Sequence, residues 1–387
     1  MRVAGLFAGI GGLELGLRNA GHEAELFAEN WSPAAAVLAA RFEHVPNVGD
    51  VAGLRALPRG VELLAAGFPC QDLSQAGRTA GISGSRSGLV DHVFRLLDRR
   101  RAPWVLLENV SFMLHLDGGR AMARLVAAFE ERGYRWAYRV VNSLSFTPQR
   151  RERVFFVASR EGRPEDVLFA DEAMPPERVF ALDTHAHGFY WTEGVRGLGW
   201  APDSVPTLKN GSTLGIASPP AILFPDGMIG KPDIRDAERL QGFPENWTKP
   251  AEAVCRSSWR WSLVGNAVTV PVAEWVGGRL ATPGRHDEAR DRPMPVSGRW
   301  PKAARFDGRR THEVEISAFP VWRRRRSLAA FLRHPVEPLS VRATAGFLGR
   351  TDRSALRFVP GFRDRVAAHL ARMEAREAML DGRIAAE

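Results

Sequence analysis

The stretch from Arg2 to Leu17, RVAGLFAGIGGLELGL, joins an apolar strand-like run, a glycine-rich turn and the start of a helical pattern. Glycines in such a turn let the backbone approach a ligand closely, and the amino end of the following helix favours a carboxylate or a phosphate. A dinucleotide fingerprint reads GxGxxG, but Glu14 stands where the last glycine belongs. The stretch therefore favours a nucleotide-type site and weakens the NAD interpretation.

The alternation of strand-like and helical patterns continues to residue 165. Strand-like runs lie at residues 23–28, 61–68, 104–109 and 153–159, and a helical pattern lies at 120–133. Apolar strands that alternate with amphipathic helices predict a parallel sheet covered by helices on both faces. We therefore predict an α/β fold for this part of the chain.

The composition changes after residue 165. Residues 166–230 are rich in proline, glycine and aromatic residues and have poor helical periodicity, so they predict a loop-rich or small β domain. Helical patterns return at residues 234–242 and beyond Gly265. Residues 281–387 hold 22 Lys and Arg against 13 Asp and Glu, so this segment carries the whole net charge of +9.

Two cysteines, Cys70 and Cys255, are too few for a disulfide framework, and no CxxC pair is present to bind zinc. The apolar runs fall short of the roughly 18 residues that a membrane span needs. We therefore expect a cytoplasmic protein that binds neither a membrane nor a metal. Within GFPCQDLSQAG, residues 67–77, Cys70 has three interpretations: a small buried core residue, a member of a metal or disulfide site, or a nucleophile on a tight turn.

Two acidic residues, Glu29 and Asp50, follow the second strand-like run, Glu29 directly after it and Asp50 at the end of a further strand-like segment. Glu29 is placed to accept hydrogen bonds from both hydroxyls of a ribose, as an acid does in dinucleotide folds, and Asp50 ends the next segment. This pattern indicates an adenosine cofactor for which a phosphate is optional. S-adenosyl-L-methionine fits, because it has an adenosine, no pyrophosphate, and a methionine carboxylate for the helix end.

Several segments further along the chain carry a family resemblance. They are GFPCQDLSQAG, SGL at 87–89, LLENV at 106–110, PQRRERVFFV at 148–157, RLQGFP at 239–244 and GNAV at 265–268. Together with FAGIGG, and in this order, they resemble the DNA cytosine-C5 methyltransferases of bacterial restriction–modification systems. The resemblance covers about residues 1–280. It implies a Rossmann-like catalytic domain that binds S-adenosylmethionine at 1–165, a target-recognition domain at 166–254, a return to the catalytic domain at 255–280 and a basic extension at 281–387.

The resemblance implies four catalytic residues. Cys70 matches the nucleophile that adds to carbon 6 of cytosine and makes carbon 5 reactive, which splits one hard step into easier ones. Glu108 matches the carboxyl group that binds N3 and the exocyclic amine, and this role needs a pKa raised by a desolvated pocket. Arg151 and Arg153 match arginines that hold O2 of the base and the nearby backbone.

The resemblance also assigns the cofactor contacts. Phe7 would stack on the adenine, and Glu29 would hold the ribose. The other contacts fall to Gly9 and Gly12 beside the methionine, to Asp50 and Val51 at the adenine edge, and to Asn266 at the methionine pocket. The family usually has an acidic residue two before the Phe of the first motif. This chain has Gly5 there, which leaves one polar contact to the cofactor unaccounted for.

The implied substrate is a cytosine flipped out of double-stranded DNA by a monomer, at sites shared with a cognate restriction endonuclease. A tRNA cytosine-5 methyltransferase is one alternative, although such members differ in the variable region and lack a long basic tail. A non-catalytic DNA-binding regulator is another, although it would be expected to have lost Cys70 or Glu108. Candidate base-reading residues are His185, His187, Tyr190, Trp191, Arg196, Lys209, Asn210, Ser212 and Thr213.

The basic extension has two interpretations. It contains WRRRR at residues 322–326 and a helical stretch at 363–380 in which arginines and acids share a face. Such i,i+4 pairs are typical of a solvated helix, so the extension could be a cap packed on the rest of the protein. Alternatively, Arg323–Arg326 bind phosphates that flank the target, which positions the protein without carrying sequence information.

Overall fold

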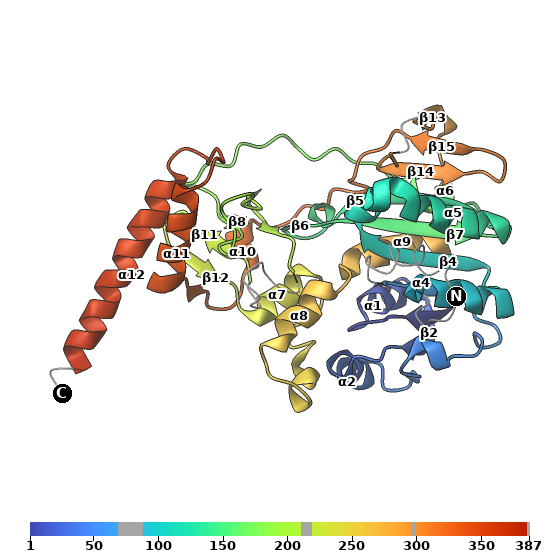
Figure 1. Ribbon diagram of the computed structural model, residues 1–387, viewed down its shortest axis with the longest axis horizontal. Coiled ribbons are helices and arrows are strands. Elements are labelled where there is room, and N and C mark those ends of the chain that lie inside the picture. Colours follow the sequence, from blue (N-terminus) through green and yellow to red (C-terminus); the bar gives the residue numbers. More distant parts are fainter. Residues whose placement is uncertain (69–87, 210–218, 296–298, 385–387) are drawn as a thin grey trace.

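The computed structural model describes residues 1–68, 88–209, 219–295 and 299–384 (Figure 1). The predicted nucleophile Cys70 lies outside these residues, and so do Asn210, Ser212 and Thr213. Among the described helices, none is long and apolar enough to cross a membrane.

Four parallel strands form one half of the main sheet. They are β1 (Arg2–Leu6), β2 (Glu23–Ala28), β3 (Leu63–Ala66) and β4 (Trp104–Val110), in the order β2-β1-β3-β4. All four were predicted from their apolar runs. Each buries side chains on both faces: in β3, Leu64 and Ala66 belong to one apolar core and Leu63 and Ala65 to another. This alternation is the physical reason why the runs are apolar throughout.

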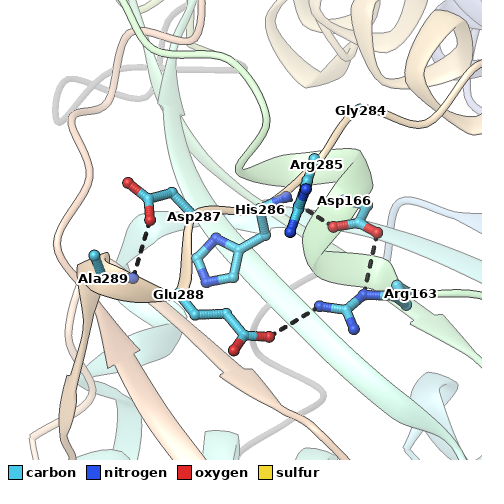
Figure 2. A pocket seen from close by; sticks show the side chains of 8 residues that line it. All are labelled: Arg163, Asp166, Gly284, Arg285, His286, Asp287, Glu288 and Ala289. Atoms are coloured by element: carbon cyan, nitrogen blue, oxygen red, sulfur yellow. Dashed lines mark hydrogen bonds and ion pairs between the residues drawn. The ribbon is translucent and has the colours of Figure 1, made fainter.

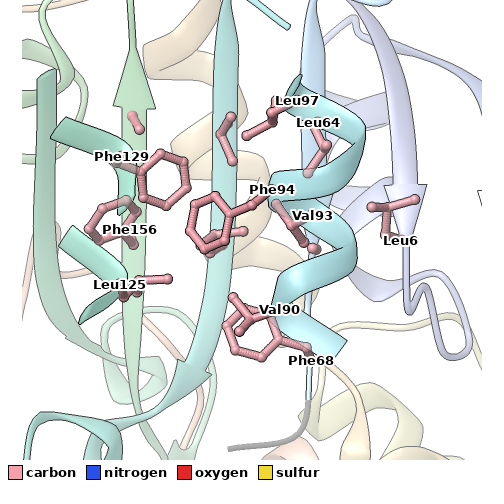
Figure 3. Close-up of a cluster of buried hydrophobic side chains, with 14 of the residues drawn as sticks. Leu6, Leu64, Phe68, Val90, Val93, Phe94, Leu97, Leu125, Phe129 and Phe156 are labelled. Atoms are coloured by element: carbon pink, nitrogen blue, oxygen red, sulfur yellow. The ribbon is translucent and has the colours of Figure 1, made fainter. Parts of the chain in front are cut away.

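Helices cover both faces of this half, as predicted. Helices α4 (Leu89–Arg99) and α5 (Arg120–Glu131) pack on one face, where Phe94 and Phe129 lie with Leu64 and Phe156 (Figure 3). On the other face, α1 (Gly12–Asn19) packs along α9 (Val270–Ala281) beside α6 (Pro164–Leu168). Helix α2 (Ser32–Arg41) follows β2.

The other half of the main sheet is antiparallel, which the sequence did not predict. Strand β7 (Glu152–Ser159) lies between β4 and β5 (Arg135–Asn142) and is antiparallel to both. Only nine residues separate β5 from β7, and a connection that short returns the chain beside itself in the opposite direction. The sheet is therefore mixed, with parallel pairing confined to β1–β4.

The C-terminal extension divides between two sheets. Strands β13 (Asp291–Pro293), β14 (Ala303–Phe306) and β15 (Thr311–Val314) extend the main sheet beyond β5 to nine strands, in the order β13-β15-β14-β5-β7-β4-β3-β1-β2. Residues 281–387 are thus not one separate unit in the structure, in contrast to the extension predicted from the sequence, because β5 offers its open edge to β14.

Ion pairs hold the segment that leads from α9 to β13. Around a surface hollow, the backbone N–H of His286 donates to Asp166 Oδ1 over 2.8 Å, and Arg163 Nη2 lies 3.3 Å from Glu288 Oε1 (Figure 2). His286 Nε2 lies 2.9 Å from Asp291 Oδ1. Contacts with Arg163 and Asp166 therefore hold this segment against α6.

A second sheet forms the smaller domain. Its strands are β16 (Glu337–Pro338), β12 (Ile229–Lys231), β11 (Ala221–Leu223), β8 (His187–Phe189) and β9 (Ala201–Pro202), in that order. Helices α11 (Val341–Asp352) and α12 (Phe362–Ile384) cover one face, where Phe189, Phe347 and Phe362 meet. The tail therefore also completes the smaller domain, and α12 forms the end of the molecule farthest from the main sheet (Figure 1).

Short elements lie between the two sheets (Figure 1). Helices α7 (Ile234–Leu240), α8 (Trp259–Asn266) and α10 (Leu328–Phe331) pack on the other face of the small sheet. Strands β6 (Gln149–Arg150) and β10 (Val205–Pro206) pair with each other and join the two domains. The chain then returns through α8 and α9 to the main sheet.

Candidate active site

A cavity of about 540 Å³ lies at the carboxyl ends of the parallel strands. In open α/β sheets, ligands bind at this edge. Segments that are distant in the sequence meet here, and the predicted residues that line the cavity are Phe7, Gly9, Gly12, Glu29, Glu108, Arg151, Arg153 and Asn266. Gly67 and Phe68, which directly precede the Pro69–Cys70 pair, line it as well. Most of the residues predicted to bind the cofactor therefore line the same cavity as Glu108, Arg151 and Arg153.

Backbone hydrogen bonds orient Glu29 at one end of the cavity. Its carboxylate accepts from the N–H of Gly9 over 2.8 Å and from the N–H of Trp31 over 2.7 Å. The turn that makes this possible is strained at Phe7, which has a φ of 54°, whereas Gly9 adopts its φ of 56° without strain. The turn and the acid are therefore held in one arrangement, as a ribose-binding acid needs to be.

Gly12 lines the cavity and also lies against the returning chain. A side chain at this position would come within 2.6 Å of the carbonyl oxygen of Val268, so glycine is needed for close packing against the returning chain. Gly11, with a φ of 78°, forms the N-cap of α1. The glycines therefore shape the amino end of α1 and let residues 265–268 lie against it.

Asp50 and Val51 are not among the residues that line the cavity. Asp50 is exposed and caps the short 3₁₀ turn at Val51–Gly53, where its side chain accepts from the N–H of Ala52 over 2.8 Å. Val51 is buried in the core of the main sheet. The structure thus leaves the predicted adenine-edge contacts outside the cavity that it describes.

Glu108 lies near the end of β4 and is 7% exposed. Its Oε1 lies 3.3 Å from Arg153 Nε on the neighbouring strand β7. Burial raises the pKa of the Glu108 carboxyl, and the positive charges of Arg153 and Arg151 oppose that rise. A side chain built at Gly67 would lie 3.7 Å from Glu108 Oε2, so the chain that leads to Cys70 passes beside this carboxyl.

Arg151 is buried and joins three parts of the chain. Its guanidinium donates to the carbonyl oxygens of Leu208 over 3.0 Å, Gly265 over 3.3 Å and Ala267 over 2.8 Å. Burial lowers its pKa, and the charge of Arg153 adds to this effect. Arg151 therefore holds the backbone around the site, while Arg153 is the arginine paired with Glu108.

Asn109 is a site residue that the sequence did not single out. Its Nδ2 donates to the carbonyl oxygen of Phe68 over 2.9 Å, and its Oδ1 accepts from the N–H of Val110 over 2.8 Å. It therefore fixes the chain two residues before Cys70. The sequence could have indicated Asn109, because it follows Glu108 on a strand predicted to be buried and a buried polar residue needs a hydrogen-bond partner.

The structure gives partners to most of the described base-reading candidates. His187 stacks on Trp200 with ring centroids 4.8 Å apart, Trp191 Nε1 donates to the carbonyl oxygen of Pro219, and Tyr190 donates to that of Thr207. Lys209 pairs with Glu193. Arg196 is exposed. Among the described residues, no cluster of three or more His, Cys, Asp or Glu side chains could hold a metal.

The mixed sheet and the cavity at its parallel end define a Rossmann-like α/β fold with a ligand site. A solved structure of the Dnmt2 methyltransferase from S. pombe shares this fold, with a TM-score of 0.53 and 16% identity over 72% of this chain and 98% of that one. The model of the family described as C-5 cytosine-specific DNA methylase matches residues 1–187.

Two curated relatives extend this match. The Type II methyltransferase M2.BsuMI of Bacillus subtilis is 45% identical over 91% of this chain and 94% of its own length. M.DsaV of Dactylococcopsis salina is 27% identical over 71% of this chain and 84% of its own length. The chain belongs to the C-5 cytosine-specific DNA methylases and is a DNA (cytosine-5) methyltransferase.

Proposed function

We propose that this enzyme transfers a methyl group from S-adenosylmethionine to carbon 5 of a cytosine in one specific double-stranded DNA sequence. A flipped cytosine would form a covalent adduct with Cys70, and the methylation would protect DNA from a cognate restriction endonuclease. The observation that supports this proposal most strongly is that one cavity is lined by Glu29 and the glycine-rich turn and also by Glu108, Arg153 and Gly67.

The cavity fits S-adenosylmethionine, which supplies an electrophilic methyl group when bound. Glu29 is fixed by two backbone N–H groups in a position to accept from ribose hydroxyls. The amino end of α1 offers its backbone N–H groups to the methionine carboxylate. Phe7 and Asn266 line the same cavity and complete the proposed contacts.

Cys70 and Glu108 would divide the chemistry at the cytosine. The thiolate forms a bond to carbon 6 while the buried Glu108 carboxyl gives a proton to N3, which leaves carbon 5 electron-rich. After carbon 5 has gained the methyl group, it loses its proton to water or hydroxide. The S–C6 bond then breaks and N3 returns its proton to Glu108, which restores the ring, the thiolate and the carboxyl. The raised pKa of Glu108 supports the role of proton donor, because it keeps the carboxyl protonated at higher pH than usual.

The arrangement of the two domains supports base flipping, which we propose a single copy of the enzyme carries out. Carbons 5 and 6 are inaccessible in a duplex, so the target base must be extruded at a cost of a few kcal/mol. The cavity opens where the returning segment 263–268 meets the main sheet, and Arg151 ties this region to Leu208 of the smaller domain.

The relatives favour DNA over tRNA as the substrate. M2.BsuMI is named as a Type II methyltransferase, and its match over 91% of this chain must include most of residues 281–387. The basic extension is therefore shared with a restriction–modification relative. This favours the DNA proposal over the tRNA and regulator alternatives.

Sequencing of DNA from cells that express the protein tests the proposal. We expect 5-methylcytosine at every copy of one short sequence, and no such mark in cells that express the Cys70→Ala variant. Methylation scattered without a common sequence, or found in tRNA alone, would contradict it.

The exposed arginines of the 322–326 segment are expected to bind phosphates without reading sequence. Arg325 is excluded, because its Nη1 lies 3.2 Å from Asp203 Oδ2 and also donates to the Asp203 carbonyl over 2.9 Å. Changing Arg323, Arg324 and Arg326 to glutamine should weaken binding to all duplexes alike. It should flatten the slope of log affinity against log salt by up to about three units, at about 0.9 for each phosphate that is no longer neutralised.

Fluorescence anisotropy over a range of salt concentrations measures this slope. The matched control changes Arg101, Arg124 and Arg135, three exposed arginines of the catalytic domain, to glutamine. If both triple variants change the salt slope equally, the effect comes from net charge alone. If the slope is unchanged in the Arg323, Arg324 and Arg326 variant, these arginines do not bind phosphates and the extension has a purely structural role.

A further inference from the structure

Glu14 is a buried carboxyl group that the proposed mechanism does not use. It lies in the first turn of α1, is 3% exposed and lines the active-site cavity. Neither of its carboxylate oxygens has a hydrogen-bond partner in another described residue. An unpartnered buried carboxylate is costly, so its presence calls for a ligand group that satisfies it.

The backbone at Gly5 makes room for this carboxylate. A side chain built at Gly5 would come within 2.4 Å of Glu14 Oε1 and would contact no other residue as closely. Glu14 therefore occupies the space that a side chain at position 5 would fill. The carboxylate of Glu14 thus reaches from α1 to the edge of β1 at this position.

The other carboxylates of the cavity are already engaged. Glu29 accepts from two backbone N–H groups, and Glu108 is paired with Arg153. Glu14 is thus the described carboxylate of the cavity that is free to receive a cation.

We propose that Glu14 binds the α-ammonium group of the methionine half of the cofactor, from the place that an acidic residue at position 5 would otherwise fill. This inference rests on the proposed use of S-adenosylmethionine. The ammonium and the carboxylate of methionine are attached to the same carbon. An acceptor for the ammonium must therefore lie next to the group that receives the carboxylate. Glu14, two residues after the first residue of α1, meets this condition.

The electrostatics of Glu14 add a second signature. Burial raises the pKa of Glu14 to about 8; its own backbone N–H opposes the rise and the charge of Glu29 adds to it. The other charged side chains of the cavity are Glu108, Arg151 and Arg153. On the neighbouring helix α9, Glu274 accepts from Asn19 and Arg279 pairs with Asp171. On β1, Arg2 lies 3.9 Å from Glu25 of β2.

Binding of a cation beside Glu14 should therefore release a proton. With a pKa of about 8, roughly nine-tenths of the molecules carry a protonated Glu14 at pH 7. An ammonium group favours the ionised carboxylate, so the proton leaves as the ligand binds. The affinity for the ligand should then rise with pH until about pH 8.

Calorimetric titration of the full chain with two ligands tests the proposal. S-adenosylhomocysteine carries the ammonium group, whereas 5′-deoxy-5′-methylthioadenosine carries the adenosine and no amino acid. Glu14→Gln should weaken binding of S-adenosylhomocysteine about 10- to 100-fold, the usual scale for a lost hydrogen bond to a charged group. The same variant should bind methylthioadenosine as the unchanged protein does, which also shows that it is folded. Glu274→Gln, a carboxyl on α9 outside the cavity, is the matched control and should change neither affinity.

Two further measurements complete the test. Titrations at pH 7 in phosphate and in Tris should report proton release for the unchanged protein and none for Glu14→Gln, because burial raises the pKa of Glu14 to about 8. The double variant Gly5→Asp with Glu14→Ala should recover affinity for S-adenosylhomocysteine that Glu14→Ala alone has lost, because the carboxylate then comes from β1.

The possible outcomes separate this inference from the proposed function. If the unchanged protein binds neither ligand, the cofactor proposal fails. If the unchanged protein and Glu14→Gln bind S-adenosylhomocysteine equally, with no proton released, Glu14 is a structural residue and the cofactor proposal stands. A double variant that binds methylthioadenosine normally, but S-adenosylhomocysteine no better than Glu14→Ala does, would contradict the placement of the ammonium beside Gly5.

Discussion

Replacing Cys70 by alanine is expected to abolish methyl transfer while S-adenosylmethionine still binds. The proposed role of the thiol is to attack the base, and the described contacts for the cofactor come from other residues, chiefly Glu29 and the amino end of α1. Single-turnover methyl transfer to duplex DNA and calorimetric titration of the cofactor measure the two effects separately.

Duplex DNA that carries 5-fluorocytosine at the target should trap the unchanged protein as a covalent adduct, because fluorine cannot leave carbon 5 as a proton does. Cys255→Ala is the matched control. Its thiol donates to the carbonyl oxygen of Ala251 over 3.2 Å, and burial raises its pKa, so it is held as an unreactive thiol. An adduct at Cys255, or transfer that survives in Cys70→Ala, would overturn the assignment.

Glu108→Gln should slow the chemical step by about 10²- to 10⁴-fold, the usual scale of acid–base assistance. An amide can donate a hydrogen bond to N3 but cannot transfer a proton, so binding of the base should suffer less than its reaction. Single-turnover rates and DNA affinities, measured side by side, distinguish the two effects. Glu152→Gln, one residue before Arg153 and outside the cavity lining, serves as the control. An unchanged rate would remove Glu108 from the mechanism.

The pH profile of the same step follows from the raised pKa of Glu108. The carboxyl donates only when protonated, so the rate should fall as the pH rises through this pKa. Because the charge of Arg153 lowers the pKa, Arg153→Gln should move the fall in rate to higher pH. A fall that stays in place would mean that another group limits the rate.

The sequence predicted the parallel half of the sheet because its strands are buried on both faces. Leu63–Ala66 shows why: each residue packs into one of two cores, so no polar residue interrupts the run. Strand β5 was not predicted because Arg139 interrupts it. That arginine is fully buried, and the groups that satisfy it, the carbonyl oxygens of Leu168, Asp171 and Ser317, are distant in the sequence.

In the candidate site, too, some residues could be predicted from local sequence and others could not. Motifs that carry their own geometry, such as the glycine-rich turn, placed Phe7, Gly9 and Glu29 at the cavity. The roles of Gly12 and Glu14 depend on contacts with Val268 and Gly5, which only the folded chain brings close. Local sequence could therefore indicate which residues matter, but not which of them lie against one another in the folded chain.

The pairing of β14 with β5 and of β16 with β12 has a consequence for synthesis of the protein. Until residues 303–306 leave the ribosome, β5 presents an unpaired edge, and until residues 337–338 do so, β12 presents another. Unpaired strand edges in a nascent chain invite aggregation. Neither sheet is complete until these strands have been synthesised, so a gene shortened after residue 280 should yield insoluble chains rather than a smaller enzyme.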